Sequence, residues 1–137
     1  MDNIRRPRIR KKPPKGINPE ELRGIYRAAL SGQPPIAYRN AAIIAFLADT
    51  GCRSEGLRTL TTDNLDLNRC RAIVTEKGKT RWVIFSEWTA RQLAIWLLKR
   101  PKDEPHVFYN MQNAVGEPLT RSGVLGLIRR LSRAARI

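Results

Sequence analysis

The stretch AAIIAFLADTGCRSEGLRTL, residues 41–60, leads from an apolar segment into a glycine and then an arginine. The apolar segment is hydrophobic nearly all round, which is typical of a helix that lies inside a core. We expect this helix over about residues 38–50, with Gly51 ending it, and a short helix over 54–60. Arg53 stands between the two helices. Because burying a guanidinium is costly without an anionic partner, the partner of Arg53 decides what this junction does.

Two kinds of partner are compatible with the stretch alone. A guanidinium held at a helix junction can bind a phosphate through two parallel hydrogen bonds. Alternatively, Arg53 pairs with a neighbouring acid, Glu55 or Asp49, and serves only to stabilise the junction. The residues of this stretch favour neither interpretation over the other.

Polar caps predict three further helices. Asn18, Ser86 and Thr120 each precede an apolar pattern of helical spacing, and each is a favoured N-cap residue. We expect the first of these helices to end near Leu30 and the second near Lys99. The domain is therefore expected to be mainly helical.

One segment in the middle of the chain has the pattern of a small antiparallel sheet. Residues 71–75 and 81–85 predict two strands of a hairpin, about residues 71–85, around the turn Lys77-Gly78-Lys79. Residues 66–67 are candidates for a short third strand. The expected fold class is thus α+β, mainly helical with a small antiparallel β-sheet.

The chain is strongly basic, and its charge is concentrated at both ends. Lys and Arg number 26 against 12 acids, for a net charge of +14. Residues 1–16 form a proline-interrupted basic arm, and residues 121–137 carry five arginines and no acid. Charge runs of one sign repel one another unless they meet an anionic partner, which indicates nucleic acid. The candidate DNA-binding residues in these runs are Arg5, Arg6, Arg8, Arg10, Lys11, Lys12, Arg121, Arg129 and Arg133.

The cysteine, histidine and apolar content of the sequence favours neither a zinc site nor a membrane-spanning segment. Cys52 and Cys70 are too few for a disulfide framework, and His106, the single histidine, does not complete a zinc site with them. We expect no metal and no cofactor. Neither a bilayer-spanning stretch nor a signal-peptide core is present, so we expect a cytoplasmic protein without a membrane partner.

The order of the motifs is more specific than any one of them. TGCR ends an apolar helix, TTDNLDL and the hairpin EKGKTRWVIFS follow, and HVFYN precedes the last helix in GEPLTRSGVLGLIRRLSRAARI. From about Ile17 to Ile137, this series resembles the catalytic domain of the tyrosine recombinases, the phage integrase family. The resemblance implies that residues 1–16 are a basic arm or interdomain linker and that residues 17–137 are part of a catalytic domain.

The resemblance also implies a chemistry, DNA breaking and rejoining without a metal. In this family a tyrosine attacks a DNA phosphate and forms a 3′-phosphotyrosyl bond. Two arginines hold the non-bridging oxygens, and a hairpin lysine protonates the leaving 5′ oxygen. The resemblance places the first arginine at Arg53 and the lysine at Lys77, with Lys79 as the second choice. Double-stranded DNA and other recombinase protomers are the implied partners.

The chain departs from the family pattern at three points. The family often has an acid three residues after the arginine, where this chain has Gly56; Glu55 is the nearest acid, and its role stays open. The family's His-x-x-Arg motif and tyrosine nucleophile lie beyond the segment matched here, so the chain alone is expected to be inactive. The family usually has a helical core-binding domain before the catalytic domain; here only the basic arm precedes it, in the place of the family's interdomain linker. We expect Tyr109 to be a core aromatic residue.

Two other functions are compatible with the sequence. The chain could be a catalytically inactive DNA-binding module or regulatory remnant of a recombinase. It could also be a general basic protein that binds RNA or DNA, although this leaves the order of the motifs around Arg53 and Lys77 without a reason.

Overall fold

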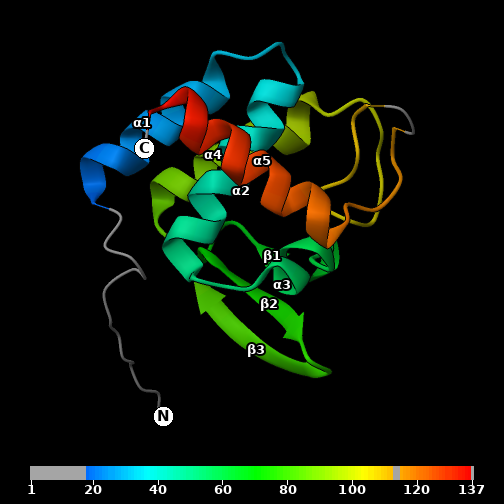
Figure 1. The fold of residues 1–137 in the computed structure, drawn as a ribbon. Coiled ribbons are helices and arrows are strands. Elements are labelled where there is room, and N and C mark those ends of the chain that lie inside the picture. The colour runs from blue at the N-terminus through cyan, green and yellow to red at the C-terminus, as the bar shows by residue number, and fades with distance from the viewer. Residues whose placement is uncertain (1–17, 113–114, 137) are drawn as a thin grey trace.

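The computed structural model describes residues 18–112 and 115–136. Helices make up most of this part of the chain, and a small sheet lies at one end of it (Figure 1). The elements in chain order are α1 (Pro19–Leu30), α2 (Ile36–Thr50), α3 (Ser54–Arg58), the 3-10 turn η4 (Thr62–Asn64), β1 (Leu65–Asp66), β2 (Arg71–Glu76), β3 (Lys79–Ile84), α4 (Glu87–Lys99) and α5 (Arg121–Ala134). The expected α+β class is confirmed.

Local capping signals account for the starts of α1, α4 and α5 and for the end of α2. The side chain of Asn18 accepts the N–H of Glu21 at 2.8 Å, and Ser86 and Thr120 cap α4 and α5 in the same way. Gly51 ends α2 in the left-handed conformation, with φ of 65°. The expected start of α2 at residue 38 was two residues late, since the helix begins directly after a proline pair.

The short helix α3 ends earlier than expected. It stops at Arg58 instead of Leu60, and the chain tightens there, because Leu60 donates to the carbonyl of Leu57 at 3.3 Å. The carbonyl of Leu60 in turn accepts the N–H of Val107 at 3.0 Å. Leu60 therefore serves as a buried joint between α3 and the segment that follows α4.

The sheet is a three-stranded antiparallel meander in the order β1-β2-β3. Glu76 pairs with Lys79, so the turn consists of two residues, Lys77 and Gly78, with φ of 53° and 75°. Two successive positive φ values are typical of two-residue hairpin turns, whose backbone twist matches the twist of the two paired strands. Both strands accordingly extend closer to the turn than the sequence predicted, and the third strand lies at 65–66, one residue earlier than expected.

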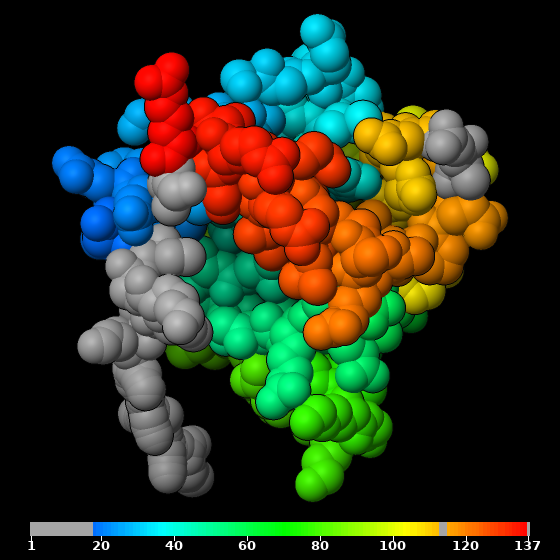
Figure 2. Space-filling model, viewed as in Figure 1, coloured from blue at the N-terminus to red at the C-terminus, as the bar shows by residue number. Residues whose placement is uncertain are grey.

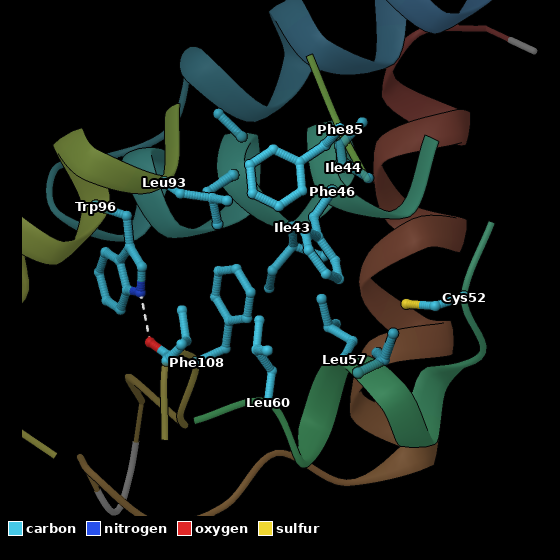
Figure 3. Packing of buried hydrophobic residues seen from close by; sticks show 14 of the residues in the cluster. Ile43, Ile44, Phe46, Cys52, Leu57, Leu60, Phe85, Leu93, Trp96 and Phe108 are labelled. Atoms are coloured by element: carbon cyan, nitrogen blue, oxygen red, sulfur yellow. Dashed lines mark hydrogen bonds between the residues drawn. The ribbon is translucent and has the colours of Figure 1, made fainter. Parts of the chain in front are cut away.

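The core surrounds α2, on which α1 and α4 pack. Ile43, Phe46 and Leu57 are fully buried and converge with Phe108 (Figure 3). The indole N–H of Trp96 donates to the carbonyl of Val107 at 2.7 Å, the bond drawn in Figure 3. α4 and the segment after it are thus bound together inside the core.

Tyr109 is a core residue, as the sequence predicted. Its side chain is completely buried, and its hydroxyl donates to the carbonyl of Lys102 at 2.7 Å. The same hydroxyl accepts the N–H of Lys102 at 2.8 Å. Both hydrogen-bonding functions of the phenol are therefore satisfied within the fold.

The last helix, α5, is amphipathic. Val124, Leu127 and Leu131 are buried on one face, at the spacing expected from the sequence. The helix crosses the front of the molecule in Figure 1 and packs on α1 and α3. Its outward face carries arginines, so α5 joins the core to a basic surface.

Among residues 18–112 and 115–136, no helix has the length and apolar character that a bilayer crossing requires. In the same described ranges, histidine, cysteine and acidic side chains do not gather in threes at metal-binding spacing. The basic arm, residues 1–16, lies outside the described residues, and so do its candidate DNA-binding residues.

Candidate nucleic-acid interface around Arg53 and the hairpin turn

Arg53 is the N-cap residue of α3, and its backbone is fixed on both sides. Gly51 donates its N–H to Leu47 at 2.9 Å, and Cys52 donates to the hydroxyl of Thr50 at 3.3 Å. The carbonyl of Arg53 accepts the N–H of Leu57 at 3.2 Å, which starts the helix. The side chain itself is exposed. The junction thus presents a guanidinium to solvent from a rigid backbone.

The remaining backbone group of Arg53, its N–H, is bound by the hairpin. It donates a hydrogen bond to the carboxylate of Glu76, the last residue of β2. The other oxygen of Glu76 pairs with the guanidinium of Arg81 on β3 at 3.1 Å. The side chain of Glu76 is only 11% exposed, whereas that of Arg81 is 48% exposed, so the ion pair lies at the edge of the surface. Neither Glu76 nor Arg81 was among the site residues predicted from the sequence.

Lys77 lies on the hairpin turn, and α3 binds its backbone. The N–H of Lys77 donates to Oε1 of Glu55 at 2.8 Å, and the lysine side chain is exposed. Glu55 is in the first turn of α3. Lys79 is also exposed, but it is the first residue of β3 and not part of the turn.

Two hydrogen bonds therefore cross between α3 and the hairpin. Glu76 of the strand binds the N–H of Arg53, and Glu55 of the helix binds the N–H of Lys77. The backbones of the two predicted functional residues are tied to each other's element, although they are far apart in the sequence. In Figure 2 the hairpin, drawn in green, protrudes from the body of the molecule. The side chains of Arg53 and Lys77 are both exposed, so a large ligand can reach them.

The local ion pairs considered for Arg53 do not form. Asp49 accepts hydrogen bonds from the N–H of Ser86 at 2.8 Å and from the hydroxyl of Thr89 at 2.7 Å. Glu55 is bound to the turn, as described above. Within the part of the chain that the structure describes, the guanidinium of Arg53 has no salt-bridge partner. It is therefore available for an anion from outside the domain.

The predicted basic residues of α5 are all on its surface. Arg121, Arg129 and Arg133 are exposed, and the buried residues of the helix lie between them in sequence. α5 also packs on α3, the helix that Arg53 caps. The arginines of α5 and Arg53 consequently belong to neighbouring elements.

Arg39 shows that not every arginine of this chain is available to a ligand. It is 7% exposed on α2 and donates to the side chain of Asn40 at 2.7 Å and to the carbonyl of Tyr109 at 3.0 Å. Burial, with a smaller contribution from the nearby charge of Arg130, lowers the pKa of Arg39 to about 10. We find no sequence signal that separates Arg39 from the exposed arginines, because its role depends on contacts made by the folded chain.

Comparison with known proteins agrees with this architecture. The model of the phage integrase family matches residues 15–137. The tyrosine recombinase XerC of Lactobacillus leichmannii is 30% identical over 133 residues, which cover 93% of this chain and 45% of the relative. The XerC of Alcanivorax borkumensis is 32% identical over 100 residues, 72% of this chain and 33% of the relative. The chain thus spans less than half the length of these relatives.

Solved structures show the same fold. The crystal structure of XerA recombinase superimposes with a TM-score of 0.76 at 27% identity, over 88% of this chain and 43% of that one. The XerH site-specific recombinase, solved in a pre-cleavage complex with its difH substrate, has a TM-score of 0.71 at 23% identity, over 88% and 36% of the two chains. This second similarity concerns the fold alone.

Proposed function

The chain belongs to the phage integrase family, the tyrosine recombinases, and we propose that it supplies part of the DNA phosphate-binding site of such an enzyme. The reaction class would be site-specific recombination or integration of double-stranded DNA. Residues 17–137 would be part of the catalytic domain, and residues 1–16 a basic arm or linker along the DNA. Other recombinase protomers would be its protein partners.

The observation that carries this proposal is the pair of crossed hydrogen bonds between α3 and the hairpin. Phosphoryl transfer is accelerated by positive groups that are already in place where negative charge develops. Arg53 would hold a non-bridging oxygen of the scissile phosphate through its planar guanidinium. Because its backbone is fixed by Glu76, only the side chain is left to be ordered when DNA binds.

Lys77 would protonate the leaving 5′ oxygen. It is on the turn itself, and its backbone is held by Glu55 while its long side chain stays exposed. Lys79 is the second choice for this role, since it lies across the strand pair from Glu76. Comparing Lys77→Ala with Lys79→Ala for DNA cleavage, each within a recombinase that contains the tyrosine nucleophile, would separate the two. Loss of the reaction in only the first variant assigns the role to Lys77.

The test of the proposed function is the binding of nucleic acid by the purified chain. Fluorescence anisotropy with labelled duplex DNA and with single-stranded RNA of the same sequence measures both affinities over a series of salt concentrations. The proposal predicts a preference for duplex DNA and an affinity that falls steeply as salt rises, because phosphate contacts release counterions. A preference for single-stranded RNA would support the general nucleic-acid binder instead. Binding that is independent of salt would contradict a phosphate site.

A further inference from the structure

A side chain at position 56 of α3 could accept a hydrogen bond from the backbone N–H of Arg53, the N-cap residue of the same helix. Arg53 is the N-cap residue of α3, which makes Gly56 the third helical residue. A glutamate at that place reaches back and accepts the N-cap N–H, as in a capping box. Helix α1 of the same chain does this, since Glu21 accepts the N–H of Asn18 at 3.2 Å. Gly56 has no side chain with which to do so.

The carboxylate of Glu76 occupies the space that a side chain at position 56 would need. A Cβ added to Gly56 would lie 2.9 Å from Oε2 of Glu76, 3.3 Å from its Cγ and 3.3 Å from Cβ of Val74. The same carboxylate accepts the N–H of Arg53. Gly56 therefore leaves space for the carboxylate of Glu76 from β2. This carboxylate binds the N–H of Arg53, which a glutamate at position 56 would otherwise have bound.

We propose that Glu76 is the positioning residue of Arg53, in the role that the family pattern gives to an acid at position 56. The inference rests on the proposed function, in which Arg53 binds a DNA phosphate. It adds a direct connection between the two halves of the site, because Glu76 immediately precedes Lys77. Arg81 pairs with Glu76 at 3.1 Å, and its positive charge partly offsets that of the carboxylate.

The direction in which Glu76→Ala changes DNA affinity shows whether Glu76 positions Arg53 or acts only through its charge. Glu76→Ala removes a negative charge beside a phosphate site, and on charge alone it must strengthen DNA binding. Positioning predicts the opposite, a weakening of about threefold to fivefold, the size expected for the loss of one hydrogen bond. Glu76→Gln keeps an oxygen that accepts the N–H of Arg53, so we expect affinity within about twofold of the wild type.

A double-mutant cycle with Arg53 tests whether Glu76 acts through that residue. Affinity for duplex DNA is measured by anisotropy for the wild type, Glu76→Ala, Arg53→Ala and the double variant, each checked by circular dichroism for folding. A positioning role predicts that Glu76→Ala has no weakening effect once Arg53 is gone. A general structural defect would weaken binding equally in both backgrounds.

An exchange variant tests the same inference without relying on Glu76→Ala. Gly56→Glu combined with Glu76→Gly returns the carboxylate to the helix, where it can close a capping box on Arg53. We expect this variant to fold and to bind DNA as the wild type does, whereas Glu76→Gly alone binds more weakly. An exchange variant that binds as weakly as Arg53→Ala, or that does not fold, would overturn the inference.

The outcomes for the inference and for the proposed function can be told apart. If Arg53→Ala weakens binding and Glu76→Ala does not, the inference fails and the phosphate site stands. The inference also fails if Glu76→Ala weakens binding by the same factor with and without Arg53. If Arg53→Ala leaves DNA binding unchanged, both are overturned.

Discussion

Glu55 and Lys77 are joined by a hydrogen bond of 2.8 Å from the backbone N–H of the lysine to the carboxylate of the glutamate. This contact places the hairpin turn against the start of α3. It is the counterpart of the bond between Glu76 and Arg53. Glu55 binds the residue that follows Glu76, and Glu76 binds the residue two positions before Glu55. The site is therefore built from backbone amides held by carboxylates, which leaves the basic side chains exposed for a ligand.

Loss of the Glu55 carboxylate should loosen the turn and leave the fold intact. We expect Glu55→Ala to lower the free energy of unfolding by about 1 kcal/mol, the usual net contribution of one such hydrogen bond. The amide hydrogen of Lys77 should then exchange markedly faster with solvent, as measured by NMR. Glu55→Gln is the matched control, since its amide oxygen can still accept the bond. Unchanged exchange at Lys77 in Glu55→Ala would contradict the contact.

The buried Arg39 should matter for stability and not for ligand binding. Arg39→Ala leaves the carbonyl of Tyr109 without its donor, and we expect a loss of about 2–4 kcal/mol in the free energy of unfolding, measured with urea. The salt dependence of DNA binding should stay as in the wild type under conditions where the variant is folded. A change in that dependence would show that Arg39 reaches the DNA.

The exposed arginines of α5 should matter for DNA binding and not for stability. Arg129→Ala and Arg133→Ala should each reduce the slope of log affinity against log salt by about 0.9, the value for one phosphate contact, with little change in stability. Arg91 of α4 is also exposed and serves as a control of equal charge. If Arg91→Ala reduces the slope as much as the α5 variants do, the arginines of α5 are not a specific DNA-contacting face.

Cys52 should make the protein less stable at alkaline pH. Burial raises the pKa of its thiol, so the folded chain keeps this proton to a higher pH than the unfolded chain does. The unfolded state therefore binds fewer protons once pH passes the ordinary thiol range, and the free energy of unfolding falls as pH rises there. Cys52→Ala should flatten that decline in urea titrations. An equal decline in the wild type and Cys52→Ala would contradict this coupling.

Features of the fold that depend on neighbouring residues could be predicted from the sequence. Asn18 and Gly51 set helix ends through local hydrogen bonds and φ values, and both were located correctly. The turn at Lys77 and Gly78 was also expected, although the strands extend closer to it than predicted. These signals lie within a few residues of the structure that they specify.

The carboxylate contacts of the site could not be predicted in the same way. Glu76 gains its role only because α3 packs on β2 closely enough for the Glu76 carboxylate to fill the space beside Gly56. A glycine and a glutamate twenty residues apart show no pattern by themselves. Arg53 and Lys77 were identified through the family resemblance, and their placement at neighbouring elements depends on the same packing.

The measurement that bears most directly on the phosphate site is the affinity of duplex DNA for the wild type, Arg53→Ala and Arg53→Lys, with Arg69→Ala as control. Arg69 is exposed and lies at the end of β2 away from the turn. We predict that both Arg53 variants bind more weakly, because lysine keeps the charge and loses the two parallel hydrogen bonds. Arg69→Ala should bind nearly as the wild type does. Equal affinities for Arg53→Ala and Arg69→Ala would contradict a phosphate site at Arg53.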